Sequence, residues 1–255
     1  MTDQSFSYFS VLSDTNILKP DTSPRDGIFN PSEDPLQHQG LGGSLPEEQA
    51  KVDRLVAAHL TPEYLAFVAH PSLRTFVRKL MGWQNEVLVK RSMLRHNAPG
   101  SRSTGIHYDQ LFLRHGASEF LTAWVPIGDC AANGGGLMYL EGSSHIGKEI
   151  EKEFMERARD MTDEERLSAF NKNMSADGTL TQDAATFASG KGRWLTANYE
   201  AGDVVFHNPY MIHCAVKNED YKTGRIRLSS DLRFYEEGSD LDHRWMNYWA
   251  PDDGL

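Results

Sequence analysis

The sequence predicts a mainly β protein with flanking α-helices, of the sandwich or jelly-roll kind, and three observations support this class. From residue 85 onward, short apolar segments alternate with Gly, Pro and Asn turn signals, which is typical of many short strands. Residues 46–82 show the spacing of packing helices instead. The chain has 255 residues, a length at which a β-rich unit still forms one domain, so we expect a single domain over residues 1–255.

Residues 1–47 are expected to form an irregular arm, because five prolines and a Gly-Gly pair fall within residues 20–47. A first helix is predicted by apolar residues that recur at helical spacing, namely Val52, Leu55, Val56 and Leu60. A second helix is expected to begin at Thr61-Pro62, since proline is favoured in the first turn of a helix.

The predicted strand regions follow in chain order, at residues 85–99, 105–116, 119–130, 135–145, 193–218 and 225–236. Between the fourth and fifth regions, residues 147–178 are dense in charge and in helix-forming residues. This insertion is expected to be a pair of amphipathic helices, either as a solvated surface feature or as a lid over a substrate site.

The composition narrows the classes of function. The 26 basic and 36 acidic residues give a formal net charge of -10, which argues against nucleic acid or an anionic membrane as the main partner. The two cysteines, Cys130 and Cys214, are too few for a disulfide framework and favour a reducing compartment. The chain has neither a signal-peptide pattern nor an apolar run of about 18 residues. We therefore expect a cytoplasmic protein that does not span a membrane.

A candidate metal site begins in the segment GIHYDQLFL. His107 and Asp109 lie two positions apart in a predicted strand, so their side chains share one face while Tyr108 takes the other. Two polar residues on a wet strand face would look the same, so a third ligand is needed. The downstream segment GDVVFHNPYMIHCAVKN offers two histidines, His207 and His213.

The sequence favours His213 as the third ligand and keeps His207 as the alternative. Pro209 follows His207 by two positions and interrupts that strand, which resumes at Met-Ile-His213. Two histidines and one aspartate would form the facial triad of non-haem Fe(II) oxygenases, which leaves coordination positions open for a cosubstrate and O2.

Four segments resemble the phytanoyl-CoA dioxygenase family of Fe(II)- and 2-oxoglutarate-dependent oxygenases, in the family's order: TGIHYDQLFLRHG, FLTAWVPIGDCAANGGGLMYLEGSSHIG, YEAGDVVFHNPYMIHCAVKN and RIRLSSDLRFY. The resemblance covers roughly residues 85–147 and 194–236. It implies a double-stranded β-helix, which is a cupin-like jelly roll, with the metal held by His107, Asp109 and His213. LEGSSH stands where many members have Pro-Gly-Ser-His, a departure that affects a turn and no ligand.

The resemblance also implies the activity. Such an enzyme binds Fe(II), 2-oxoglutarate and O2, releases succinate and CO2, and oxidises a small molecule by hydroxylation, desaturation or a related C–H oxidation. The net acidity disfavours a polyanionic substrate, so we expect a small molecule of the secondary-metabolite kind. Two alternatives remain at this stage, a Zn2+-dependent jelly-roll hydrolase or isomerase and a catalytically silent binding module.

The far carboxylate of 2-oxoglutarate needs a fixed cation, and arginine suits it because the planar guanidinium can bond both oxygens. Arg225, Arg227 and Arg233 share one strand parity in GRIRLSSDLRF. Arg233 is six positions beyond Arg227, roughly 20 Å along a strand, and is expected to be too far away. Ser229 shares the face of Arg227 and offers a hydroxyl, which favours Arg227 and leaves Arg225 as the alternative. The family's Arg-x-Ser strand also aligns with Arg227.

Two further residues are family-like candidates for the wall of the cosubstrate site. Gln110 lies beside the metal motif, and Trp124 lies on the predicted strand LTAWVP. A tryptophan on a central strand fits a core position equally well, so the sequence leaves both interpretations of Trp124 open.

Overall fold

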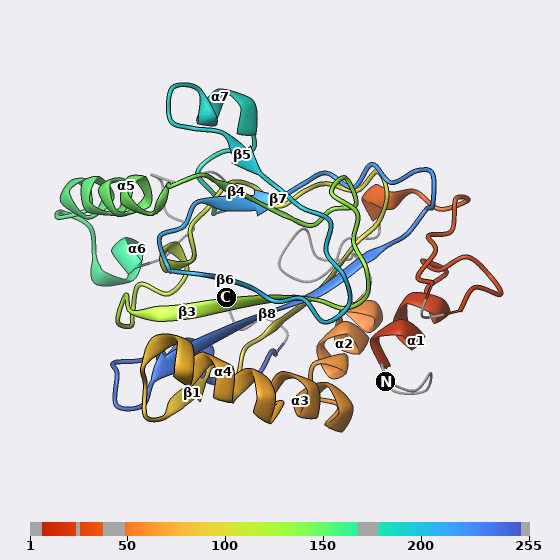
Figure 1. Cartoon of the computed structure of the whole chain (residues 1–255), viewed down its shortest axis with the longest axis horizontal. Coiled ribbons are helices and arrows are strands. Elements are labelled where there is room, and N and C mark those ends of the chain that lie inside the picture. Colours follow the sequence, from red (N-terminus) through yellow and green to blue (C-terminus); the bar gives the residue numbers. More distant parts are fainter. Residues whose placement is uncertain (1–6, 24–25, 38–48, 168–177, 251–255) are drawn as a thin grey trace.

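Two antiparallel sheets face each other in the computed structural model, which describes residues 7–23, 26–37, 49–167 and 178–250 (Figure 1). The larger sheet has the order β1-β8-β3-β6, with β2 also paired to β8, and the smaller has the order β5-β4-β7. The strands of the larger sheet are β1 (Glu86–Leu88), β2 (Met93–Asn97), β3 (Phe120–Pro126), β6 (Val205–His207) and β8 (Arg227–Glu236). Those of the smaller sheet are β4 (Leu137–Leu140), β5 (Trp194–Leu195) and β7 (His213–Ala215). The predicted class, mainly β with flanking helices, is confirmed.

The side chains of strand β8 are mainly polar on one face of the larger sheet and mainly apolar on the other. Successive side chains of a strand point to opposite faces. Arg227, Asp231 and Arg233 line a cavity on the face toward the smaller sheet. Leu228 and Leu232, on the other face, belong to the largest apolar core cluster. The polar and apolar alternation of β8 therefore separates the candidate site from the core.

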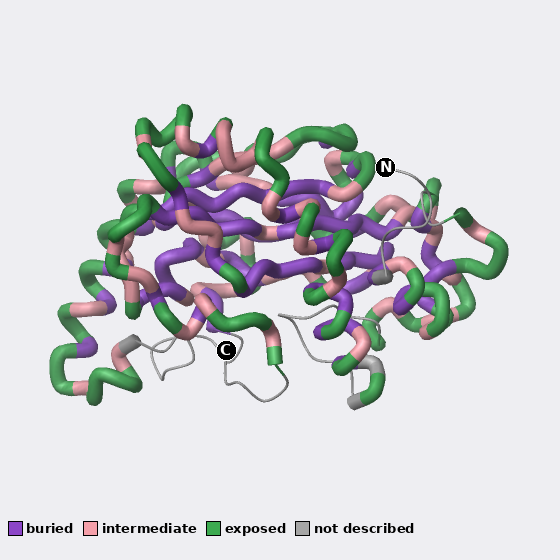
Figure 2. Tube along the Cα trace, turned by 90° about the horizontal axis from the view of Figure 1, so that it is seen from below, coloured by how far each residue is buried: buried purple, intermediate pink, exposed green. Residues whose placement is uncertain are grey.

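Four helices cover the outer, apolar face of the larger sheet (Figure 1). They are α1 (Ser7–Asp14), α2 (Gln49–Ala58), α3 (Pro62–Val68) and α4 (Pro71–Met81). The second predicted helix is interrupted at His70 because Pro71 has no amide hydrogen to continue the helical bonding, and Pro71 opens α4 instead. Figure 2 shows that the buried residues lie along extended segments in the middle of the molecule, with the exposed residues around them.

The expectation of an irregular arm over residues 1–47 is wrong for its first part. The helix α1 lies in this region, and η1 (Pro35–Gln37) adds a 3₁₀ turn. Tyr8, Val11 and Leu12 recur at helical spacing and are buried, so α1 is stabilised by packing. Residues 1–6, 24–25 and 38–47 of the arm lie outside the described residues.

The insertion is helical where it is described. It contains most of α5 (Ser144–Arg157) and all of α6 (Asp163–Leu167), while its residues 168–177 lie outside the described part. After it come α7 (Ala184–Ala188) and, near the chain end, the 3₁₀ helix η3 (His243–Met246). The lid function and the single domain over 1–255 stay predictions.

The strand predicted over residues 105–116 is much shorter than expected. Ile106 and His107 form only isolated β-bridges, to Thr181 and His213, and the chain then turns into the 3₁₀ helix η2 (Asp109–Leu111). Tyr108 is still extended, with φ -130° and ψ 148°, so the alternation of side chains persists for one step beyond His107.

Candidate metal centre

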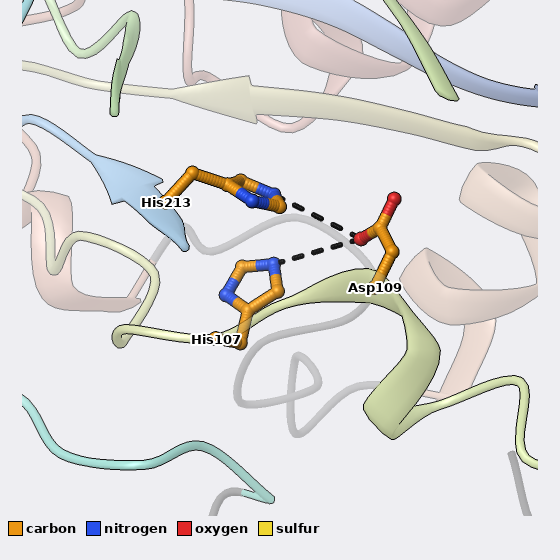
Figure 3. A group of neighbouring side chains, drawn as sticks. All are labelled: His107, Asp109 and His213. Carbon is orange, nitrogen blue, oxygen red and sulfur yellow. Dashed lines mark ion pairs between the residues drawn. The ribbon is translucent and has the colours of Figure 1, made fainter. Parts of the chain in front are cut away.

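His107, Asp109 and His213 converge between the two sheets (Figure 3). His107 and His213 are bridge partners, and each donates its amide hydrogen to the other's carbonyl oxygen, at 3.0 and 2.9 Å. Asp109 Oδ1 lies 4.0 Å from His107 Nε2 and 3.8 Å from His213 Nε2. One nitrogen or oxygen atom from each of the three side chains lies within 4.8 Å of the others, which is a spacing that a single metal ion can bridge.

Backbone carbonyls orient both imidazoles. Nδ1 of His107 lies 2.7 Å from the Gly105 carbonyl oxygen, and Nδ1 of His213 lies 2.9 Å from that of Met211. A carbonyl accepts only, so Nδ1 carries the proton in each ring and Nε2 is left with a lone pair toward Asp109. Burial lowers the pKa of His107 and of His213, so both rings are neutral and able to bind a metal at neutral pH.

Asp109 is the most heavily bonded of the three. Arg233 donates from Nη2 to Oδ1 at 3.2 Å and from Nε to Oδ2 at 3.3 Å, and the Thr122 hydroxyl also donates to Oδ2. His207 Nε2 lies 3.3 Å from the same Oδ2. Burial by itself would raise the pKa of Asp109, but the Arg233 guanidinium and the hydrogen bond to His207 hold it well below its usual range. The carboxylate is therefore ionised and fixed in direction.

His207, the alternative third ligand, lies next to the group and outside it. Its Nε2 contacts Asp109 Oδ2 rather than Oδ1, the oxygen nearest to His107 and His213, and its Nδ1 lies 3.2 Å from the Tyr139 hydroxyl. Both ring nitrogens of His207 are therefore engaged. The structure thus gives His207 the position of a partner of Asp109.

Arg227 lies buried in the same cavity as the three side chains. Its Nε donates to the Gly135 carbonyl oxygen at 2.8 Å, and its Nη1 donates to the Ser229 hydroxyl at 2.7 Å. Gly135 has a positive φ of 86°, and a Cβ there would lie 2.4 Å from Asn97 Oδ1, so this position requires glycine. Within the described part of the chain, no carboxylate forms an ion pair with Arg227. A buried cation without such a partner is suited to binding an anionic ligand.

The other predicted cosubstrate residues are placed differently. Arg225 is partly exposed and lies 3.8 Å from Asp129 Oδ2, away from the cavity that Arg227 lines. Trp124 is both a buried residue and a cavity wall, with an edge contact to Tyr199 at 4.9 Å between ring centroids. Gln110 is buried, and its Oε1 has no partner among the described residues. It is not among the residues that line the cavity.

Sequence reasoning gave no role in the site to six further residues that line this cavity, Arg95, Thr104, Thr122, Leu137, Asp231 and Arg233. The signal for Thr122 was present, because it shares the strand parity of Trp124 on β3. Arg233 likewise shares the strand parity of Arg227. It contacts Asp109 of the candidate metal centre, whereas Arg227 lies six residues away on β8. Arg95 Nε lies 3.7 Å from Asp231 Oδ2, so these two residues of the cavity wall form an ion pair.

The fold and this donor set define a class, that of jelly-roll proteins with a His-Asp-His metal centre. A family profile described as Phytanoyl-CoA dioxygenase (PhyH) matches residues 42–227, which is most of the chain. The protein therefore belongs to the phytanoyl-CoA dioxygenase family, as the resemblance in its sequence predicts. The members of this family are oxidoreductases that use Fe(II), 2-oxoglutarate and O2.

Solved structures with a similar fold include the epimerase SnoN from nogalamycin biosynthesis, in complex with Fe3+, alpha ketoglutarate and nogalamycin RO. Its TM-score is 0.50 at 18% identity, over 72% of this chain and 63% of that chain. The carbocyclase SnoK from the same biosynthesis has a TM-score of 0.49 at 20% identity, over 73% of this chain and 63% of that chain. AviO1 from Streptomyces viridochromogenes Tue57 has a TM-score of 0.45 at 15% identity, over 70% and 63%. The chain thus spans less than two thirds of the length of these proteins.

A comparison with curated proteins gives no match. No helix in the described part of the chain is long and apolar enough to cross a membrane.

Proposed function

We propose that this protein is a non-haem Fe(II)- and 2-oxoglutarate-dependent dioxygenase that oxidises a C–H bond of a small molecule. One observation carries the proposal: a His-Asp-His group lines the same cavity as the buried Arg227, which forms no ion pair with a carboxylate of the described residues. A metal site alone would fit many chemistries. A metal site together with a cation for a dicarboxylate fits this one.

In this proposal His107, Asp109 and His213 hold the iron. Neutral imidazole nitrogens and a carboxylate oxygen are the donor set that non-haem Fe(II) oxygenases use. The two histidine protons are already placed on Nδ1 by the carbonyl oxygens of Gly105 and Met211, so no rearrangement is needed before the metal binds. When bound, iron and 2-oxoglutarate supply the oxidising chemistry, with release of succinate and CO2.

Arg227 and Ser229 are proposed to hold the far carboxylate of 2-oxoglutarate. Arg227 Nη1 already contacts the Ser229 hydroxyl, so the guanidinium is oriented before any ligand arrives. Trp124 forms the wall beside them and limits access of water to the site. Gln110 is proposed to support the turn at Asp109, since it is buried there without lining the cavity.

The substrate is proposed to be a small molecule of the secondary-metabolite kind. SnoN and SnoK, which share the fold, are named for nogalamycin biosynthesis. The net charge of -10 is in keeping with this class, because it disfavours a polyanionic substrate. The oxidation is proposed to be a hydroxylation, a desaturation or a related C–H oxidation.

Anaerobic titration of the protein with Fe(II) and then 2-oxoglutarate tests this proposal. We expect a weak metal-to-ligand charge-transfer band in the visible that appears only when both are present. Neither a Zn2+-dependent hydrolase or isomerase nor a catalytically silent binding module would give such a band. A succinate-release screen against a library of small molecules would then find the substrate, with product masses shifted by one oxygen or by loss of two hydrogens.

A further inference from the structure

A buried carboxylate, Glu151, lies outside the cavity of the candidate metal centre. Glu151 points inward from α5, and its side chain is 11% exposed. It accepts a hydrogen bond from the Tyr108 hydroxyl at 2.6 Å and two from Arg114, each at 2.8 Å. The Arg114 side chain is 1% exposed, and its guanidinium lies over the Phe154 ring of α5. None of these four residues lines the cavity.

The partners of Glu151 bracket the metal-binding turn. Tyr108 stands between His107 and Asp109, and because it is extended its phenol points away from the side of these two ligands. Arg114 follows shortly after the end of η2, the turn that Asp109 begins. The Glu151 carboxylate on α5 therefore binds residues on both sides of the turn that Asp109 begins, and one of them, Tyr108, directly follows His107.

Residues at the start of α5 contact residues 208–212, which lead to the third ligand, His213. The Ser143 hydroxyl accepts the Ile212 amide at 3.0 Å, and Asn208 Nδ2 donates to the Ser144 hydroxyl at 2.7 Å. Gly147 packs so closely that a Cβ there would lie 2.1 Å from the Tyr210 carbonyl oxygen. The residues just before His213 are thus held by the same helix that holds Tyr108.

We infer that α5 is a brace that fixes the spacing of the two metal-binding segments, with Glu151 as its central positioning residue. In Figure 1, α5 lies beside the end of the smaller sheet, where the insertion begins. Groups that orient metal ligands from behind change metal affinity by about 10–100-fold when they are removed. Glu151 acts in this way through the turn between Tyr108 and Arg114. This inference rests on the proposed metal site, and it extends the role of the insertion beyond that of a lid.

A purely structural role for Glu151 makes a different prediction. Loss of a buried ion pair lowers the melting temperature of a protein, whatever the pair does for function. If the role of Glu151 is purely structural, its loss leaves the affinity of the folded protein for a metal unchanged. Metal affinity and coordination geometry, measured well below the melting temperature, therefore separate the two roles.

The test is anaerobic titration with Co(II), followed by its visible absorption, for the wild type, Glu151→Gln and Glu153→Gln. Glu153 is exposed on the same helix and is the matched control. We expect Glu151→Gln to fold, to bind Co(II) at least about tenfold more weakly and to show an altered band shape. We expect Glu153→Gln to match the wild type. Wild-type Co(II) affinity in folded Glu151→Gln would overturn the inference.

Tyr108→Phe decides the matter if Glu151→Gln does not fold. It removes one hydroxyl from the turn and leaves the pair between Glu151 and Arg114 intact. We expect Co(II) affinity to fall about threefold or more, with faster amide exchange over residues 105–113. Unchanged affinity would overturn the inference in that case. A wild type that binds no Co(II) would refute the proposed metal site itself, which is a different result from unchanged affinity in the variants.

Discussion

The Arg233 guanidinium contacts both carboxylate oxygens of Asp109, with Nη2 3.2 Å from Oδ1 and Nε 3.3 Å from Oδ2. Oδ1 is also the oxygen that faces His107 and His213. The Arg233 guanidinium therefore neutralises Asp109 from one side while the metal is expected on the other. The ring of Trp245 lies 4.9 Å from the guanidinium and keeps it in place.

Arg233→Met should destabilise the metal-free protein and make it more responsive to metal. Removing one partner of a buried pair leaves an uncompensated charge, at a cost of about 3–5 kcal/mol. A divalent cation would compensate Asp109 in its place, so Mn2+ should raise the melting temperature of the variant more than that of the wild type. Thermal unfolding with and without Mn2+ measures both effects, with the partly exposed Arg225→Met as control. Equal Mn2+ shifts in wild type and Arg233→Met would contradict the expectation.

His107→Ala, Asp109→Ala and His213→Ala should each abolish turnover of 2-oxoglutarate while the fold stays largely intact. Each variant leaves two of the three ligands that the proposal assigns to iron. His207→Ala should have a milder effect, because His207 contacts Asp109 and lies outside the group. Succinate release and circular dichroism together check this. Full activity in any one of the three alanine variants would remove that residue from the triad.

The sequence predicts the convergence of His107, Asp109 and His213 better than it predicts the elements that carry them. Alternation along a strand pairs His107 with Asp109, although the strand ends at His107 and Asp109 begins a 3₁₀ helix. The pairing survives because Tyr108 remains extended. A single extended residue between His107 and Asp109 is enough to point both side chains to the same side of the backbone.

Other features depend on contacts that no local pattern encodes. Arg233 reaches Asp109 across 124 positions of sequence, and Tyr108 reaches Glu151 across 43. Composition identifies the insertion as charged and helical, but it does not show that Glu151 points inward. The prolines and glycines of residues 20–47 predict irregular structure for the arm as a whole. The apolar stripe of α1 is short and precedes them, so its helix is not predicted.

Arg227→Ala should raise the KM for 2-oxoglutarate at least about tenfold and affect Fe(II) binding less. The expected cause is loss of the buried cation that Ser229 orients at 2.7 Å. Arg225→Ala should do much less, because Arg225 is partly exposed and lies beside Asp129. Steady-state kinetics with varied 2-oxoglutarate, together with Fe(II) titrations, distinguish the two. The opposite ranking of the two variants would move the anchor to Arg225.

The pH dependence of stability should reflect buried His59, which links α2 to β2. Its Nδ1 lies 2.8 Å from the Leu55 carbonyl oxygen, and the Leu94 amide donates to its Nε2 at 3.0 Å. Burial lowers the pKa of His59 from 6.5 to about 4. Between these values the unfolded chain binds the proton and the folded chain does not, so stability falls as the pH falls through this window. The loss from His59 should be roughly 3 kcal/mol by pH 4.

His59→Gln isolates this contribution, because an amide can donate to the Leu55 carbonyl oxygen, accept from the Leu94 amide, and does not titrate. Urea unfolding at a pH of about 7.5, about 5.5 and about 4 should show a shallower loss of stability in the variant. Burial also lowers the pKa of His107 and His213, so some acid sensitivity should remain. His243→Gln, at an exposed position, should follow the wild type. Parallel curves for His59→Gln and the wild type would show that His59 does not control acid stability.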